Sequence, residues 1–211
     1  MNIDYLEHLF SAISGSDFNE QQEATLILED FINDPQSVFL FFQLIDNEDL
    51  SSVNYKIATI LTRKYMQNCY YRLSSQLQDQ IINKLINYIF TKNDNFITIY
   101  FSDLIYEYTK CDSKYYDLLL HLIDSSIKKQ ENKYGFIKLL GKYVKSFDQD
   151  SPLLLANKDN FFQYSLLGLQ SQPNDNNDII IESVKLYFIL KSKNLSTENE
   201  PHLDIIIQNI L

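Results

Sequence analysis

Few residues of this chain have the types and spacing that catalysis requires. The segment from Gly135 to Gly141, followed by Lys142, has the outline of a phosphate-binding loop. However, Tyr143 stands where such a loop needs Ser or Thr for magnesium, and no strand is predicted before it. The apolar residues between the two glycines recur at helical spacing, so this segment is predicted to be the interior of a helix.

Metal ligands are also poorly placed in the sequence. Residues 175–178 and Glu182 supply oxygen atoms, but they lack the glycine and the ligand spacing of a calcium loop, so a helix-capping turn is predicted. His8, His121 and His202 are isolated in sequence, and His121 lies in a leucine-rich run where a partly buried packing role is expected. We therefore expect neither a metal nor a cofactor.

The two cysteines, Cys69 and Cys111, have neither metal-ligand spacing nor the pattern of a disulfide framework. Each is expected near the end of a helix as a free, reduced side chain. Because no set of polar residues converges in the pattern of an active site, we expect a protein that is not an enzyme.

Composition favours a helical protein that binds other proteins. Only four Gly and four Pro occur in 211 residues, which leaves little material for hairpins. The net charge of −10 argues against nucleic acid as a ligand and favours basic partners, although it could serve solubility alone.

The amino terminus lacks the basic region of a secretory signal, and no apolar run is long enough to span a bilayer. A soluble, intracellular protein is expected.

A unit of two amphipathic helices recurs about every forty residues. The first helices of the units are predicted to begin near residues 3, 35, 74, 113, 158 and 197, which lie 32, 39, 39, 45 and 39 residues apart. The second helices are predicted to begin near residues 17, 49, 94, 131 and 177. This period is typical of HEAT and armadillo repeats. The predicted fold is therefore an all-α, right-handed α-α superhelix of about five helix pairs plus a final unpaired helix.

Two segments of the expected solenoid have further predicted features. Residues 148–159 are predicted to form a Pro-containing connection with a short helical turn at 153–155, before helices at 161–169 and 179–190. The helix that begins near Asp49 is expected to bury one apolar stripe, which consists of Val53, Ile57, Ile60, Leu61 and Tyr65.

The carboxyl-terminal segment 197–211 ends on apolar residues, although a terminal repeat should have a polar outer face. We expect either that the chain is the front portion of a longer solenoid or that this end docks on another chain. Residues 1–211 are predicted to form one solenoid.

Four segments of the first 110 residues carry a likeness to a known family. Their sequences are QQEATLIL at 21–28, VNYKIATILTRK at 53–64, YYRLS at 70–74 and QII at 80–82. This region resembles the amino-terminal domain of the importin-beta (karyopherin-beta) nuclear transport receptors, and residues 111–211 continue the repeats more loosely. The arginines of the family pattern are replaced by Gln21, Asn54 and Thr98, and its tryptophan by Tyr70.

The resemblance implies a nuclear import receptor found in the cytoplasm, the nucleus and at the nuclear pore. Its implied partners are the small GTPase Ran in its GTP form, basic cargo proteins and nucleoporin Phe-Gly repeats. The implied Ran contact face comprises the residues of the second-repeat inner helix that are expected to leave the apolar stripe: Tyr55, Thr59, Thr62, Arg63 and Met66. An exportin, or a HEAT scaffold subunit of a phosphatase or chromosome-organising complex, is the alternative.

Overall fold

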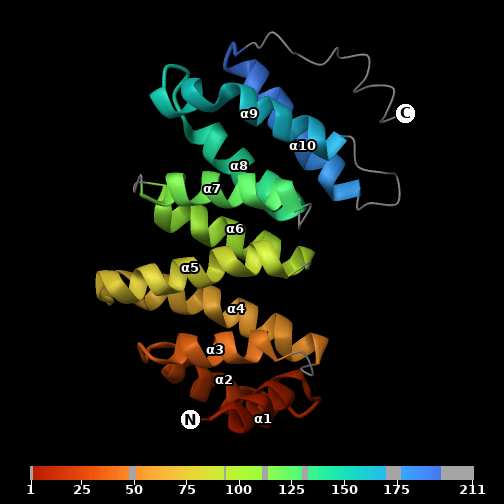
Figure 1. The fold of residues 1–211 in the computed structure, drawn as a ribbon. Coiled ribbons are helices and arrows are strands. Elements are labelled where there is room, and N and C mark those ends of the chain that lie inside the picture. The colour runs from red at the N-terminus through yellow and green to blue at the C-terminus, as the bar shows by residue number, and fades with distance from the viewer. Residues whose placement is uncertain are drawn as a thin grey trace. The chain divides into compact units, whose positions relative to one another are not determined.

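A computed structural model describes residues 2–47, 51–92, 94–110, 114–129, 133–169 and 177–195. These residues form α-helices, one short 3-10 helix and their connections, without a strand (Figure 1). The helices group into two compact units, Met1–Leu85 and Ile86–Leu211. The all-α prediction is confirmed, and the ten α-helices of the described residues agree with five helix pairs.

The first unit contains two complete helix pairs. Its elements are α1 (Ile3–Ser14), α2 (Phe18–Ile32), α3 (Ser37–Asp46), α4 (Ser52–Cys69), η1 (Tyr70–Arg72) and most of α5 (Ser75–Thr91). α1 packs on α2, and α3 packs on α4. Contacts between α1 and α3 and between α2 and α4 join the pairs, so corresponding helices of successive pairs lie side by side. This pairing is compatible with an α-solenoid.

Polar side chains begin the helices of both units. The Asp17 carboxylate accepts hydrogen bonds from the Asn19 and Glu20 amides at the start of α2, as predicted from its position. Asp94 accepts from the Ile97 amide in the same way and begins α6. Asp49, predicted to begin the next helix, lies outside the described residues, and Ser51 is the N-cap residue of α4.

Two side chains of α4 hold it to the connection between α2 and α3. The Tyr65 hydroxyl donates to the Pro35 carbonyl at 2.9 Å, and the Cys69 thiol donates to the Ile32 carbonyl at 3.3 Å. Burial is the main cause that raises the pKa of both groups, and the Asp34 carboxylate raises each further. Arg72 opposes the effect at Cys69 without reversing it. Cys69 is therefore a buried, protonated thiol, as expected of a free reduced cysteine.

The second unit is organised around α8. Its helices are the end of α5, α6 (Asn95–Thr109), α7 (Lys114–Lys129), α8 (Lys133–Ser146), α9 (Pro152–Leu169) and α10 (Asn177–Ser192). α8 contacts α6, α7, α9 and α10, whereas α9 and α10 also pack on each other. The buried Tyr143 ring of α8 makes edge contacts with Tyr106 and Tyr116, so aromatic rings fill the space around α8.

Two predictions about this unit are wrong. The connection predicted at residues 148–159 is largely helix, because α9 begins at Pro152. Proline is well suited to the first position of a helix, and the polar residues Asp159 and Asn160 lie on the exposed side of α9. His121 is exposed on α7 and is not partly buried. The predicted final helix at 197–211 lies outside the described residues, and one continuous solenoid over 1–211 stays a prediction.

Helices of the second unit approach each other closely at Gly168 of α9. A Cβ atom at this position would lie 1.8 Å from the Ser183 Oγ atom of α10 and 2.8 Å from the Ile137 Cδ1 atom of α8. Both distances are far below van der Waals contact, so three helices meet where only a glycine fits. By contrast, a Cβ atom at Gly141 of α8 would meet nothing within 4 Å.

We predict that Gly168→Ala destabilises the protein by about 1–3 kcal/mol, because the added methyl group must push helices apart. Gly141→Ala is the matched control and should be neutral or slightly stabilising, since alanine favours the helix. The measurement is urea denaturation followed by circular dichroism. Adding Ser183→Ala should recover part of the loss by removing the Oγ atom. Equal midpoints for Gly168→Ala and Gly141→Ala would contradict the close approach.

Candidate functional site

The Ran contact face predicted on α4 is not an exposed surface. Thr59, Thr62 and Met66 are each 0% exposed, so the prediction that they leave the buried stripe is wrong. The threonines can be buried because each hydroxyl bonds within its own helix: Thr59 donates to the Tyr55 carbonyl at 3.0 Å, and Thr62 donates to the Ala58 carbonyl at 2.9 Å. Contact between Ran and the partly exposed Tyr55 and Arg63 stays a prediction.

The apolar stripe of α4 is rotated relative to the predicted one. Val53 is 50% exposed and Ile60 is 38% exposed, although both were expected in the core, whereas Leu61 and Tyr65 are buried as expected. The exposed side of α4 also carries Lys56, Lys64, Gln67 and Asn68. α1, α2 and α3 pack against α4. The face of α4 that they bury contains two threonines and is not its most apolar face.

Two residues that replace the family arginines, and the one that replaces the tryptophan, are hydrogen-bonded or buried. The Gln21 amide group donates to the Gly15 carbonyl at 2.5 Å, which ties the first turn of α2 to the turn before it. Thr98 is 0% exposed in α6. Tyr70, which replaces the tryptophan, is buried in η1. Gln21 therefore helps to hold the start of α2 in place.

Charge is distributed unevenly along the chain, which the net charge conceals. Residues 1–55 contain eleven Asp and Glu but no Lys or Arg, whereas the rest of the chain contains 18 basic and 17 acidic residues. Most of the carboxylates on α1–α3 and their connections are exposed: Asp4, Asp17, Glu20, Glu23, Glu29, Asp30, Asp34 and Asp46. A count of charges by segment would have predicted this acidic surface.

A groove of about 260 Å³ lies between α1 and α2 in this acidic region. Its lining combines apolar and acidic side chains: Tyr5, His8, Leu9, Ala12, Glu20, Glu23, Ala24 and Ile27. Leu9 and Ala24 are buried at its floor, whereas Glu20 and Glu23 are exposed. The Tyr5 ring is 42% exposed, so the groove also offers an aromatic contact.

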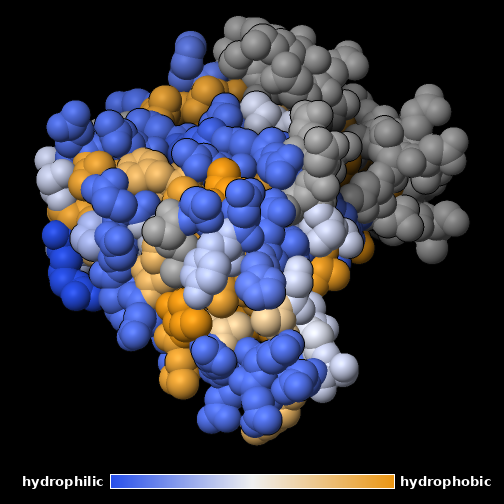
Figure 2. Space-filling model, turned by 90° about the horizontal axis from the view of Figure 1, so that it is seen from below, coloured by the Kyte–Doolittle hydropathy of each residue, from blue (hydrophilic) through white to orange (hydrophobic). Residues whose placement is uncertain are grey.

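This groove suits the side chains of lysine and arginine. Their aliphatic stems can lie on apolar surface while the charged group reaches a carboxylate. Further apolar surface is exposed on α2 at Phe18 and Leu26. Figure 2, which views the molecule from the side on which α1 lies in Figure 1, shows a mainly hydrophilic surface with separate hydrophobic patches. The groove therefore has the chemistry of a site for a basic, partly apolar peptide segment.

Among the described residues, the other chemical motifs of the sequence lie in helices. Gly135 and Gly141 lie within α8, as predicted, so the apparent phosphate loop is helix. Within the described ranges, no three His, Cys, Asp or Glu side chains are placed to hold a metal ion. None of the described helices has the length and hydropathy needed to cross a membrane.

The sequence matches no protein-family model and no curated protein.

We predict that Met66→Lys strongly destabilises the protein, because it places a charge among the helices that cover α4. Gln67→Lys is the matched control on the exposed side of the same helix and should change the unfolding free energy by less than about 0.5 kcal/mol. Chemical denaturation of both variants measures the difference. If Met66→Lys were tolerated as well as Gln67→Lys, the predicted contact face would be restored.

Proposed function

We propose that this chain is a protein-binding helical-repeat protein of the importin-beta class that receives basic cargo on the acidic groove between α1 and α2. In this proposal it is a nuclear import receptor, or part of one, and works without catalysis as a right-handed superhelix in cytoplasm and nucleus. Its other partners are the GTP form of Ran and the Phe-Gly repeats of nucleoporins.

The observation that carries the proposal is the groove on a charge-segregated surface. Glu20 and Glu23 border an apolar floor, and no Lys or Arg precedes Lys56 to compete for these carboxylates. Clustered charge of one sign attracts a basic partner from a distance and speeds its association. The apolar floor then adds contact area at short range.

Binding of Ran rests on the resemblance of α2 and α4 to the family pattern. Arg63 and Tyr55 remain partly exposed and can contribute to such a contact. If Ran and cargo bind one deformable stack of helix pairs, each can change the affinity for the other. In an importer, Ran would release the cargo, and in an exportin it would strengthen cargo binding.

A scaffold subunit outside nuclear transport is the second candidate. The burial of Thr59, Thr62 and Met66 favours it, because these residues leave little of the proposed Ran face accessible. A scaffold would use the same acidic groove to hold a basic segment of a constant partner. The two candidates differ in whether Ran affects that binding.

We predict that a fluorescein-labelled peptide rich in Lys and Leu binds the protein, and that Glu20→Lys with Glu23→Lys weakens this binding at least tenfold. Reversing two charges replaces attraction by repulsion at the rim of the groove. Fluorescence anisotropy measures the affinity, and circular dichroism checks that α2 remains folded. The matched control, Asp117→Lys with Asp159→Lys, reverses two exposed charges in the second unit. An equal loss in both double variants would refute a site at the groove.

We also predict that Ran loaded with a non-hydrolysable GTP analogue binds the protein and that Arg63→Glu weakens this interaction. The substitution reverses the one partly exposed charge of the predicted face. Isothermal titration calorimetry measures the affinity, with Lys84→Glu as a charge-reversal control on α5. Absence of Ran binding to the unaltered protein would favour the scaffold. Release of the basic peptide on addition of Ran would identify an importer.

A further inference from the structure

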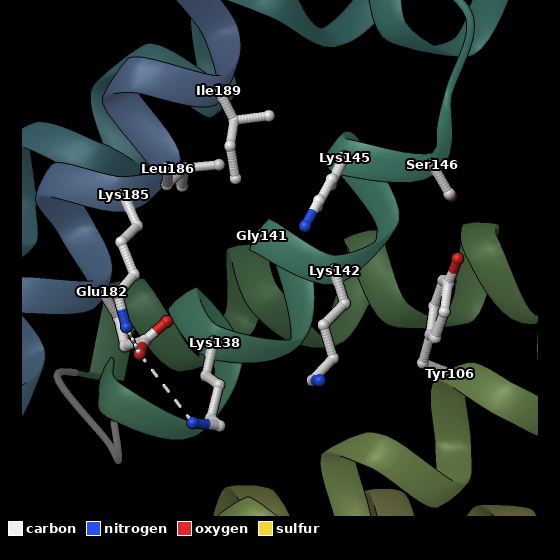
Figure 3. A pocket seen from close by; sticks show the side chains of 10 residues that line it. All are labelled: Tyr106, Lys138, Gly141, Lys142, Lys145, Ser146, Glu182, Lys185, Leu186 and Ile189. Atoms are coloured by element: carbon white, nitrogen blue, oxygen red, sulfur yellow. Dashed lines mark hydrogen bonds and ion pairs between the residues drawn. The ribbon is translucent and has the colours of Figure 1, made fainter.

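The second unit contains a larger groove of opposite charge. It lies along α8 and α10, with Tyr106 of α6 at one side, and has a volume of about 630 Å³. Figure 3 shows its lining side chains, which are Tyr106, Lys138, Gly141, Lys142, Lys145, Ser146, Glu182, Lys185, Leu186 and Ile189. This volume is within the range of sites that bind a ligand.

Lysine dominates the charge of this groove. Four lysines and one glutamate line it, within a protein whose net charge is −10. Glu182 accepts a hydrogen bond from Lys185 at 2.7 Å and lies 3.8 Å from the Lys138 amine. Lys142 pairs with Asp103 of α6. Even with both carboxylates counted, the groove keeps two surplus positive charges.

The surplus charge lies on the α8 side of the groove. Lys145 is exposed and has no ionic or hydrogen-bonded partner among the described residues. In Figure 3 its side chain extends from α8 toward the side that Leu186 and Ile189 line from α10. Each ammonium group has three donors, so the paired lysines can also donate a hydrogen bond to a further ligand oxygen.

The spacing of these lysines follows one face of α8. Lys138, Lys142 and Lys145 are separated by four and three residues, so they form a row about 10 Å long. In an extended peptide, alternate side chains point to the same side about 6.6 Å apart. Two carboxylates at alternate positions can therefore reach successive lysines of the row, while the residue between them turns toward the opposite wall.

Gly141 makes room for such a ligand. It lies on the lining of the groove beside Lys142, and a Cβ atom there would meet nothing within 4 Å. The absence of a side chain at this position leaves the middle of the lysine row open. On the other wall, Leu186, Ile189 and the Tyr106 ring offer apolar surface to the residues between the acidic ones.

We propose that this groove binds an acidic peptide segment in which Asp or Glu alternates with apolar residues. Singly charged carboxylates match amines that are spread along a row and partly neutralised by Glu182 and Asp103. A compact phosphate could contact only part of a row about 10 Å long. Nucleic acid requires a continuous basic track, and the net charge of −10 opposes it. The site is independent of the proposed function, because it lies in the other unit and selects the opposite charge.

The test is a titration of the full chain with a fluorescein-labelled eight-residue peptide in which Glu alternates with Leu. A peptide with Lys in place of Glu, inorganic phosphate and a single-stranded oligonucleotide complete the set of probes. We expect saturable binding of the acidic peptide and no binding of phosphate or of the oligonucleotide. The Lys peptide should bind the α1–α2 groove instead, so Lys145→Glu should not weaken its binding. Absence of binding up to millimolar peptide, or tighter binding of the oligonucleotide or of phosphate, would overturn the proposal.

Two variants then test separately the charge of the groove and the free space inside it. Lys145→Glu should weaken binding at least fivefold, because an attractive charge becomes repulsive. Gly141→Leu should weaken it to a similar extent without a change of charge, since the new side chain occupies the middle of the groove. Lys64→Glu, an exposed reversal on α4, is the matched control and should leave the affinity unchanged. If all three variants bind equally, or if Lys64→Glu loses as much as Lys145→Glu, the groove is not the site.

Discussion

Burial of a polar side chain between helices costs least when its polar atom finds a partner without water. Among the described residues, some small hydroxyl side chains meet that requirement within their own helices, whereas those of Ser37, Thr98, Ser102 and Ser183 are buried without a partner. Thr59 and Thr62 of α4 bond to carbonyls one turn earlier, and Ser165 of α9 bonds to the Phe162 carbonyl. Thr109 of α6 bonds to the Ile105 carbonyl and also to the Tyr143 hydroxyl of α8. Small hydroxyl residues that bond within their own helix can therefore be buried between helices.

This way of packing explains what the sequence predicted and what it did not. Helix starts were predictable where a capping side chain marks them, as at Asp17 and Asp94, because capping is a local interaction. The buried face of α4 was not predictable from hydropathy, since burial of Thr59 in place of Ile60 is decided by the neighbouring helices. Pro152 suggested a connection, but proline is also well suited to the first position of a helix, where α9 places it.

The two grooves differ in how far the sequence could have revealed them. The acidic surface of α1 and α2 follows from the absence of Lys and Arg before Lys56, which an average over the whole chain hides. The row formed by Lys138, Lys142 and Lys145 is also visible as helical spacing within one segment. The opposite wall of that groove comes from α10, about forty residues later, and Tyr106 comes from α6. Only the tertiary contacts of α8 with both helices bring these parts together.

Because the two grooves have opposite charges, salt should affect the association of their ligands differently. An acidic peptide approaching the lysine groove first meets the field of a molecule with a net charge of −10, which repels it. At physiological ionic strength, this field is screened beyond about 8 Å, whereas contacts inside the groove are closer than that and are screened less. Moderate salt should therefore remove the distant repulsion before it removes the local attraction. A basic ligand of the α1–α2 groove experiences attraction at both ranges, so salt can only weaken its association. The two sites would then respond differently to ionic strength because they share one net charge but have opposite local charges.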